Sequence, residues 1–212
     1  MTPLGLTIAI PRGALFGESL DLLDRLGVPT GEIRSNDRKL IFEDIGVVTM
    51  RPSDVPTYVE HGAADIGITG KDVLLEQADR EVYELLDLGY GLCRMVVAAH
   101  AGDDPLGAPL RRRGSVRIAT KYPRIASEYF TSTGRAAEIV EVKGSVEIAP
   151  LTGLVDAIVD LTASGRTLVE NDLVEHEEIV RCTARLIANP VSHKLKAVEI
   201  DALVERIRGL EA

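Results

Sequence analysis

The chain has 212 residues, with 24 Lys and Arg against 33 Asp and Glu, a formal net charge of −9 and 45% hydrophobic residues. This apolar content is sufficient for a sizeable core, so the composition excludes an intrinsically disordered chain. A net negative chain with 4% aromatic residues is a poor general binder of nucleic acid, because neutralising phosphates requires an excess of Lys and Arg. An anionic ligand must therefore be met by a local cluster of cations or by backbone amides.

The cysteines and the first residues indicate a reducing compartment. Cys93 and Cys182 have no CxxC neighbour and no histidine at metal-ligand spacing, so we interpret both as core thiols. The N-terminal sequence lacks the pattern of a signal peptide, and no apolar run approaches the ~20 residues that span a bilayer. We therefore expect a cytoplasmic protein that binds neither membrane nor nucleic acid.

The N-terminal half alternates short apolar runs with amphipathic segments. Residues 14–26 place four leucines close to one helical face, and Gly27 follows as a C-terminal stop. Ser53 and Pro56 predict the start of a helix that ends near His61. The predicted strands are 6–11, 39–44, 47–51, 64–69 and 83–87. The second and third of these are expected to pair as a hairpin.

The second half repeats this alternation. A strand at 93–99 is expected to pair with the strand at 83–87, and residues 102–114 form an exposed connection or a surface helix. The further predicted elements are strands at 116–120, 137–142, 156–161 and 178–189, and helices at 123–134, after a Ser145 cap, from Thr167 and at 195–210. The alternation predicts two α/β lobes of ~90 residues each. In such proteins ligands bind beyond the carboxyl ends of strands and between the lobes.

The strongest candidate for a binding site is the segment 155–168, VDAIVDLTASGRTL. Its apolar strand leads into a loop of small residues that opens a helix, and the loop amides and hydroxyls can surround a phosphate. Gly165 lets the backbone approach that anion. Asp156 and Asp160 are four residues apart on one face of a strand, where they can accept hydrogen bonds from ribose hydroxyls. A strand, turn and capped helix without a ligand explains the same pattern.

Other candidate features are cations and glycines at strand ends. Residues 10–14 (IPRGA) present a cation and backbone amides after the first strand, although an ordinary turn has the same pattern. Cations on four other segments would clamp phosphate if they converge, and each is otherwise a surface charge. They are Arg38, Lys39, Arg51, Lys71 and Arg94. Glycines within residues 62–72 indicate a close approach of the backbone to a helix or to a flat ligand. Neither GxxxxGKS/T nor GxGxxG occurs, which excludes the Walker-type and dinucleotide-binding loops.

Together these segments resemble the ATP phosphoribosyltransferase family in its short form. The resemblance spans nearly the whole chain. Its most specific motifs are RPSDVPxYVExGxADIGIxGKD at 51–72 and DAIVDxxxSGxTL at 156–168. The other matching segments are PRG near the start, RKLIFED at 38–44, YELLDLGYGLCRMVVAA at 83–99, RIATKYPRIA at 117–126 and ARLIANP at 184–190.

The resemblance implies a two-lobed α/β fold like that of the type II periplasmic binding proteins, with the active site in the cleft between the lobes. One domain would comprise residues 1–91 and 183–212, and the other residues 92–182. The family joins N1 of the adenine of ATP to C1′ of 5-phosphoribosyl 1-pyrophosphate (PRPP) and releases pyrophosphate, as the first step of histidine biosynthesis. It requires Mg²⁺ with the phosphate substrates, and no side chain of the chain is expected to hold a metal ion.

The resemblance also implies roles for individual residues. Three arginines would act as catalytic residues that neutralise the leaving pyrophosphate: Arg12, Arg38 and Arg51. PRPP would be bound by Gly13, Asp156, Asp160, Thr162, Ala163, Ser164, Gly165, Arg166 and Thr167. ATP contacts are expected at Asp65, Gly70, Lys71, Asp72, Asp87 and Arg94. The chain departs from the family's Pro-Lys-Gly-Arg sequence, because Arg12 replaces the lysine and Ala14 removes one cation.

Short-form members need a separate regulatory subunit that resembles a histidyl-tRNA synthetase catalytic domain, so a homodimer within a hetero-octamer is implied. One alternative is a cytoplasmic two-lobed binding protein for a small anion, without catalysis. Another is a nucleobase phosphoribosyltransferase of the other major fold, which carries adjacent acids rather than the separated acids of DAIVD. A third is a regulatory subunit with a decayed site, which Ala14 leaves open.

Overall fold

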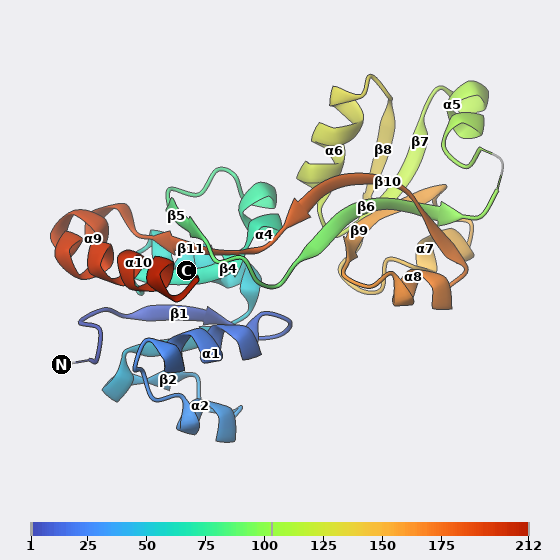
Figure 1. Ribbon diagram of the computed structural model, residues 1–212. Coiled ribbons are helices and arrows are strands. Elements are labelled where there is room, and N and C mark those ends of the chain that lie inside the picture. Colours follow the sequence, from blue (N-terminus) through green and yellow to red (C-terminus); the bar gives the residue numbers. More distant parts are fainter. Residues whose placement is uncertain (1, 103, 212) are drawn as a thin grey trace. The chain divides into compact units, whose positions relative to one another are not determined.

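The computed structural model describes residues 2–102 and 104–211, and the chain forms two compact units. Unit 1 comprises Met1–Gly91 and Thr183–Ala212, and unit 2 comprises Leu92–Cys182. The C-terminal segment is therefore built into the N-terminal unit. Figure 1 shows the elements of both units, coloured along the chain.

Unit 1 contains a six-stranded sheet in the order β2-β3-β1-β4-β11-β5. Its strands are β1 (Ile8–Pro11), β2 (Ile41–Phe42), β3 (Val47–Met50), β4 (Ile66–Gly70), β5 (Tyr83–Asp87) and β11 (Ala184–Ala188). β1 is parallel to β3 and β4, and β11 is antiparallel to both β4 and β5. The carboxyl ends of β1, β3, β4 and β5 therefore lie at the same edge of this sheet.

Helices cover both faces of the sheet of unit 1. They are α1 (Phe16–Arg25), α2 (Gly31–Ser35), α3 (Val55–Glu60), α4 (Lys71–Glu76), α9 (Pro190–Leu195) and α10 (Ala197–Glu211), with 3₁₀ turns at Glu43–Ile45 and Pro52–Asp54. On one face, Leu23 of α1 and Leu203 of α10 belong to the same apolar cluster as Ile8 and Ile10 of β1. Burial of these side chains is what ties the C-terminal helix to the first strand.

The opposite face of this sheet is covered by α3, whose Val55 and Val59 pack with Ala9 of β1. Gly67 in β4 permits this packing, because a Cβ at that position would lie 2.6 Å from Val55 Cγ1 and 2.8 Å from Val59 Cγ2. Both distances are far shorter than a normal carbon–carbon contact, so any side chain there would push the helix off the sheet. At Gly67 the close backbone approach predicted for residues 62–72 thus accommodates a helix.

Unit 2 contains a five-stranded sheet in the order β10-β6-β9-β7-β8. Its strands are β6 (Cys93–His100), β7 (Val116–Thr120), β8 (Ala137–Glu141), β9 (Ala157–Thr162) and β10 (Leu173–Cys182). Its helices are α5 (Gly107–Arg113), α6 (Pro123–Ser132), α7 (Ile148–Leu151) and α8 (Arg166–Glu170). β7 is parallel to β8 and β9, whereas β6 is antiparallel to β9 and β10.

One face of the sheet of unit 2 is covered by α7 and α8, which lie next to each other in Figure 1. Ala149 of α7 and Leu168 of α8 belong to one apolar cluster with Val96, Ala98 and Ile158 of the sheet. Leu168 therefore anchors the short helix α8, and with it the loop that joins β9 to α8.

The structure corrects two predictions about strands. Residues 83–87 and 93–99 do not pair, because β5 and β6 belong to different sheets. The long strand predicted at 178–189 is two strands, β10 and β11, one in each unit. The terminal helix predicted at 195–210 is confirmed as α10, and a short helix that the sequence analysis does not predict, α9, precedes it. An apolar run indicates that a strand is buried, but it does not indicate which sheet the strand joins.

The predicted hairpin is confirmed, since β2 and β3 pair antiparallel. The 3₁₀ turn Glu43–Ile45 shortens its first strand to two residues. The predicted helix caps are wrong: α3 and α7 begin after Asp54 and Glu147, and neither Ser53 nor Ser145 occupies the cap position. Serine is common at helix starts, but packing decides which residue begins the helix.

Candidate functional site

The loop of residues 162–167, between β9 and α8, forms a turn closed by its own hydrogen bonds. The backbone N–H of Gly165 donates to Thr162 Oγ1 at 2.9 Å, and that of Arg166 donates to Ser164 Oγ at 3.4 Å. Gly165 has a φ of +74°, a conformation that favours glycine. Thr162 is buried, whereas the loop residues after it, apart from Gly165, are exposed. The turn therefore presents backbone and hydroxyl groups to solvent while its base is fixed.

Asp160 and Lys121 lie near the carboxyl ends of the parallel strands β9 and β7. Lys121 Nζ lies 3.7 Å from Asp160 Oδ2, and Asp160 Oδ1 accepts the N–H of Leu161 at 2.9 Å. Burial raises the pKa of Asp160 above its usual value, and Lys121 offsets this only in part. A desolvated carboxylate beside an exposed loop is suited to accept hydrogen bonds from sugar hydroxyls. Lys121 is not among the site residues predicted from the sequence. Its position directly after the predicted strand 116–120 is the sequence feature that could have identified it as a candidate cation.

Arg94 also lies beside the 162–167 loop. It is directly opposite Thr162 in the antiparallel pairing of β6 and β9, so both side chains leave the same face of the sheet. Its guanidinium donates two hydrogen bonds to Glu175, at 2.6 and 2.9 Å, and lies 3.5 Å from Glu178. The sequence predicts Arg94 as an ATP contact, together with residues of unit 1, but the structure places it with this loop in unit 2. No local motif distinguishes Glu175 in the sequence.

Asp156 lies at the other end of β9 from the loop. It precedes the strand, accepts the N–H of Arg117 at 2.8 Å and forms an ion pair with Arg113. Six residues of extended strand separate it from Thr162, a span of about 20 Å. The structure therefore does not bring Asp156 together with the loop. The four-residue spacing to Asp160 indicates a shared face, but gives no information about which end of the strand is used.

In unit 1, three predicted cations follow three neighbouring parallel strands. Arg12 follows β1, Arg51 follows β3 and Lys71 follows β4, and these strands are adjacent in the order β3-β1-β4. Arg51 and Arg38 are exposed, and within residues 2–102 and 104–211 neither guanidinium makes an ion pair or a hydrogen bond. Both are therefore available to an anionic ligand at this edge.

The guanidinium of Arg12 is held by the protein on three sides. It donates to Thr49 Oγ1 at 2.9 Å and to the backbone carbonyls of Asp37 and Lys39 at 2.5 and 2.8 Å. It also stacks over the Phe16 ring, 5.4 Å from the centroid. Arg12 thus ties the end of β1 to the segment that carries Arg38.

Gly13, next to Arg12, has a φ of +104° and open space around the position of a side chain. A residue other than glycine would be strained there by its backbone conformation rather than by crowding. Gly13 therefore keeps the backbone after β1 accessible, as the sequence predicts for a ligand-binding turn.

Four of the predicted ATP contacts lie at the carboxyl edge of unit 1, after β4 and β5. They are Gly70, Lys71, Asp72 and Asp87. Lys71 pairs with Glu84 at 2.6 Å, and the carboxylate of Asp72 packs directly against Gly70. Asp87 forms an ion pair with Arg185 and accepts a hydrogen bond from Thr183 at 2.7 Å.

Asp65, the remaining ATP contact predicted in unit 1, lies at the opposite edge, before β4. One carboxylate oxygen accepts the N–H of Thr7 at 2.8 Å and the ammonium of Lys196 at 2.7 Å, and the other accepts the Ser192 hydroxyl at 2.8 Å. Burial raises the pKa of Asp65, but these hydrogen bonds outweigh it and hold that pKa below its usual value. Asp65 anchors the C-terminal segment to the sheet, which is a structural role.

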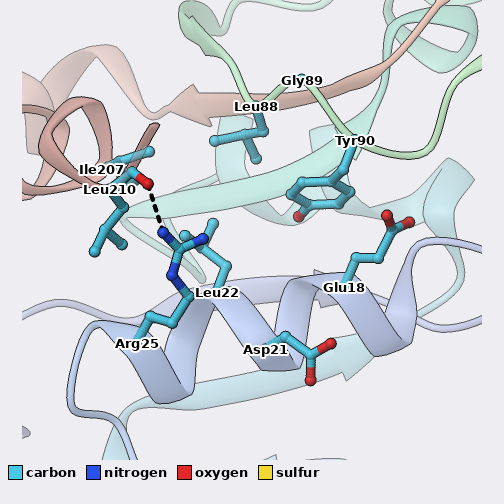
Figure 2. Close-up of a pocket in the computed structure, with 9 residues that line it drawn as sticks. All are labelled: Glu18, Asp21, Leu22, Arg25, Leu88, Gly89, Tyr90, Ile207 and Leu210. Atoms are coloured by element: carbon cyan, nitrogen blue, oxygen red, sulfur yellow. Dashed lines mark hydrogen bonds between the residues drawn. The ribbon is translucent and has the colours of Figure 1, made fainter. Parts of the chain in front are cut away.

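A pocket of about 460 Å³ lies in unit 1, beside α1 and α10 (Figure 2). The Tyr90 hydroxyl on its wall lies 2.9 Å from Ser19 Oγ, and Arg25 donates to the carbonyl of Leu210 at 2.5 Å. Burial raises the pKa of Tyr90 to about 12. The pocket is lined by Glu18, Asp21, Leu22, Arg25, Leu88, Gly89, Tyr90, Ile207 and Leu210. No site residue predicted from the sequence is among them.

Among the residues that the structure describes, no three His, Cys, Asp or Glu side chains form a group that could hold a metal ion. Within the same residues, no helix has both the length and the apolar character needed to cross a bilayer.

Comparison with known proteins gives consistent matches. The family model described as HisG, ATP phosphoribosyltransferase, matches residues 51–209. An ATP phosphoribosyltransferase of Rubrobacter xylanophilus is 52% identical over 206 residues, covering 96% of this chain and 95% of that protein. One from a Geobacillus species is 48% identical over 208 residues, covering 95% and 97%.

Solved structures extend the comparison to the fold. The ATP phosphoribosyl transferase (HisG:HisZ) complex from Thermotoga maritima matches with a TM-score of 0.79 and 36% identity, covering 96% of this chain and 97% of that chain. The periplasmic aliphatic sulphonate binding protein SsuA of Escherichia coli matches with a TM-score of 0.61 at 11% identity, covering 95% and 70%. This second likeness concerns the fold alone, and it confirms the predicted type II periplasmic-binding-protein-like architecture.

Proposed function

We propose, for a chain that belongs to the ATP phosphoribosyltransferase family, that the 162–167 loop holds the 5′-phosphate of PRPP. The family prediction made from the sequence motifs is confirmed, and the likeness to the HisG:HisZ complex fits the short form. The chain is a pentosyltransferase that transfers the phosphoribosyl group of PRPP to ATP in histidine biosynthesis. A binding protein without catalysis is not favoured by these matches.

The observation that supports the phosphate site is the closed, exposed turn at Gly165. Hydrogen bonds from Gly165 and Arg166 to the side chains of Thr162 and Ser164 fix the loop before a ligand arrives. A pre-formed loop loses little conformational entropy on binding, so more of its interaction energy contributes to affinity. The exposed Ser164 and Thr167 hydroxyls, with the loop amides other than those of Gly165 and Arg166, are the donors that a phosphate requires.

The ribose of PRPP is assigned to Asp160 rather than to Asp156. Asp160 lies on the same strand face as Thr162 and is desolvated, whereas Asp156 is bonded to Arg113 and Arg117 about 20 Å away along β9. A ribose attached to a phosphate in the loop cannot reach that far. Lys121, next to Asp160, adds a positive charge to the same edge.

The leaving pyrophosphate is assigned to Arg51 and Arg38, because their guanidinium groups are exposed and uncommitted among the described residues. Arg12 serves as a positioning residue, since its hydrogen bonds to Thr49, Asp37 and Lys39 hold the segment that carries Arg38. Gly13 keeps the adjacent backbone open.

The contacts to ATP are assigned to Gly70, Lys71, Asp72 and Asp87. They lie at the same edge of the sheet as Arg51, after strands that run parallel to β3. Asp65 and Arg94 are left out of this set, because Asp65 holds the C-terminal segment and Arg94 lies beside the 162–167 loop.

The chemistry requires positioning and charge stabilisation rather than a covalent intermediate. The lone pair of adenine N1 forms a bond to C1′ while the bond from C1′ to the pyrophosphate oxygen breaks, and pyrophosphate leaves with both electrons. C1′ develops positive character and the leaving group gathers negative charge, which Arg51 and Arg38 stabilise. No general base is needed for the attack, because neutral adenine N1 already carries a lone pair.

This enzyme class uses a divalent metal with its substrates. The described residues contain no group of carboxylates, thiols or imidazoles that fits a resident ion, and we derive no step through a metal held by the chain. We assign the ion to the substrate, as Mg²⁺ bound to the pyrophosphate of PRPP. Mg²⁺ commonly keeps its waters and phosphate ligands rather than entering an all-protein site.

A regulatory partner in a hetero-oligomer is supported by the Thermotoga maritima complex. We extend this to a regulatory subunit resembling a histidyl-tRNA synthetase catalytic domain, and to a homodimer of this chain within a hetero-octamer. We also propose a cytoplasmic location, which is in keeping with the membership of this chain in a family of biosynthetic enzymes.

The test is an assay of ATP plus PRPP, with and without a HisZ-type subunit, that follows the N1 adduct by absorbance. Replacing both loop hydroxyls (Ser164→Ala with Thr167→Ala) is expected to raise the KM for PRPP at least tenfold, because hydrogen bonds to a charged group are lost. The KM for ATP should change little. The exposed Ser132→Ala variant in α6 is the control. An unchanged KM for PRPP would remove the loop from the site.

A further inference from the structure

The Glu175 carboxylate stands close to the loop that we assign to the 5′-phosphate, and a second carboxylate, Glu178, follows it on β10. A Cβ built on Gly165 would lie 3.3 Å from Glu175 Oε1, so this carboxylate borders the turn itself. Glu178 lies next to it along β10. A phosphate monoester carries a charge between −1.5 and −2 near neutral pH. Bare carboxylates so close to it would repel the ligand that the loop is built to hold.

The irregular shape of β10 is what places both carboxylates on the same side. Residues three apart in a regular strand project from opposite faces. Register shifts between Glu175 and Glu177 and between Glu178 and Val180 change this, so that Glu175 is opposite Ala98 and Glu178 is opposite Val96. Both positions share the sheet face of Arg94 and Thr162, because side chains alternate along β6. Bulges of this kind typically re-aim side chains near functional sites.

Arg94 neutralises Glu175, and it shares Glu178 with Arg181, which lies 2.9 Å from that carboxylate. It donates to Glu175 through two nitrogens, at 2.6 and 2.9 Å, and lies 3.5 Å from Glu178. The side chains of Arg94 and Glu175 are each 30% exposed, so this two-point ion pair is accessible to a ligand at the loop. The two bulges of β10 bring it to the side of the sheet that carries Thr162. Their location at the loop points to a role in ligand binding.

We propose that Arg94 is a positioning residue of the phosphate site, which holds and neutralises Glu175 so that the 162–167 loop can accept an anion. The proposal rests on the proposed function, because it assumes that this loop binds the 5′-phosphate. It assigns Arg94 to PRPP binding and not to ATP, and it gives Glu175 a defined part in the site. Without the guanidinium, the Glu175 carboxylate would face the incoming phosphate without a compensating charge.

The test measures the Kd for PRPP by titration calorimetry on the full chain, for wild type and four variants. Arg94→Met is expected to raise the Kd at least tenfold, and the Kd for ATP should stay within twofold. Combining Arg94→Met with Glu175→Gln should recover most of the loss, because the uncompensated charge nearest the loop is removed. Arg94→Lys, which keeps the charge without the two-point geometry, should lie within about threefold of wild type.

Arg181→Met is the matched control. Arg181 is directly opposite Arg94 in the pairing of β6 with β10 and forms an ion pair with Glu178 at 2.9 Å, but it is 70% exposed and lies on the far side of Arg94 from β9. Its Kd for PRPP should stay within twofold of wild type. If Arg94→Met fails to fold, the test compares wild type with Arg94→Lys and with the double variant Arg94→Met, Glu175→Gln. Equal loss in the single and paired variants would overturn the neutralising role.

The loop variant separates this inference from the proposed function. If Ser164→Ala with Thr167→Ala weakens PRPP binding while Arg94→Met does not, the loop assignment stands and the role of Arg94 is refuted. If the loop variant binds PRPP as tightly as wild type, the phosphate site itself is misplaced and both proposals fall.

Discussion

The two units differ in the hydrogen-bond partners that they provide for a buried carboxylate. Asp65 in unit 1 accepts three hydrogen bonds of 2.7 to 2.8 Å, from Thr7, Ser192 and Lys196, and its pKa lies below the usual value. Asp160 in unit 2 is desolvated, has its cation 3.7 Å away, and has a raised pKa. The Asp65 carboxylate is therefore satisfied by the protein, whereas the Asp160 carboxylate can still accept hydrogen bonds from a ligand.

The same contrast holds for the arginines. Arg113 is bonded to Asp156 at the amino end of β9, far from the proposed site. Arg51, at the carboxyl edge of unit 1, is exposed and makes no ion pair within the described residues. From this comparison we infer that Asp65 and Arg113 hold the fold together, and we propose that the incompletely paired Asp160 and Arg51 at the carboxyl edges bind substrate.

The largest effect is expected at Arg51, the uncommitted cation. Arg51→Ala should lower kcat about a hundredfold, because removing one charge-stabilising group typically costs ~3 kcal/mol of barrier. ATP binding and the unfolding midpoint should change far less, since Arg51 makes no bond that holds the fold. Steady-state kinetics with ATP and PRPP provide the measurement, and Arg208→Ala on α10 is the control. Unchanged turnover would remove Arg51 from the catalytic residues.

A smaller effect, on stability alone, is expected at Asp65. Asp65→Asn should cost about 2 kcal/mol, because the buried site loses a charged acceptor and leaves Lys196 without its partner. Urea unfolding measures this, with the exposed Asp201→Asn as control. Turnover at saturating substrate should be unchanged. A loss of activity without a loss of stability would instead support a direct contact with ATP.

The pH dependence of this effect has a defined sign. The folded pKa of Asp65 is lowered, so its stabilising contribution is present above the unfolded pKa, near 3.9, and disappears as the pH falls through the folded value. Wild type and Asp65→Asn should therefore differ most near neutral pH and converge in acid. A difference that persists well below pH 3 would contradict the assignment.

The smallest change in stability is expected at Asp160. Here the substitution should stabilise the fold, whereas Asp65→Asn should destabilise it. The raised folded pKa of Asp160 means that the ionised form destabilises the fold, so stability is full below the unfolded pKa and is lost as the pH rises through the folded one. Asp160→Asn should therefore stabilise unit 2 at pH 7 by about 1 kcal/mol while it weakens PRPP binding. Thermal unfolding at two pH values and calorimetry with PRPP measure the two effects. A variant that is both less stable and fully able to bind PRPP would refute the comparison.

Local sequence patterns predicted much of the fold because most elements are short apolar runs bounded by Gly or Pro. The strand 116–120 and the hairpin around Ile45–Gly46 are present in the structure at or near the predicted positions. The assignment of strands to sheets could not be predicted in this way. The run 178–189 is continuous in pattern, but its halves enter different sheets, and only long-range packing decides this.

Part of the candidate site was predictable for a similar reason. A loop of small residues after a buried strand marked residues 162–167, and the family motifs pointed to the same segment. Asp156 is predicted as a site residue from its four-residue spacing to Asp160, and Asp65 from the family motif at 51–72. Both lie at the amino end of their strands, and one-dimensional spacing does not distinguish the two ends of a strand from each other.

The sequence by itself determined the family, the α/β class, the turn at 162–167 that we propose as the phosphate site, and the cations that follow β1, β3 and β4, because each of these depends on residues close together in the chain. The tertiary structure alone decided which polar groups are already satisfied. Glu175 reaches the loop, and Lys196 neutralises Asp65, only because distant segments are folded against one another. Charge, burial and hydrogen bonding between such segments depend on three-dimensional proximity, which local sequence patterns do not encode.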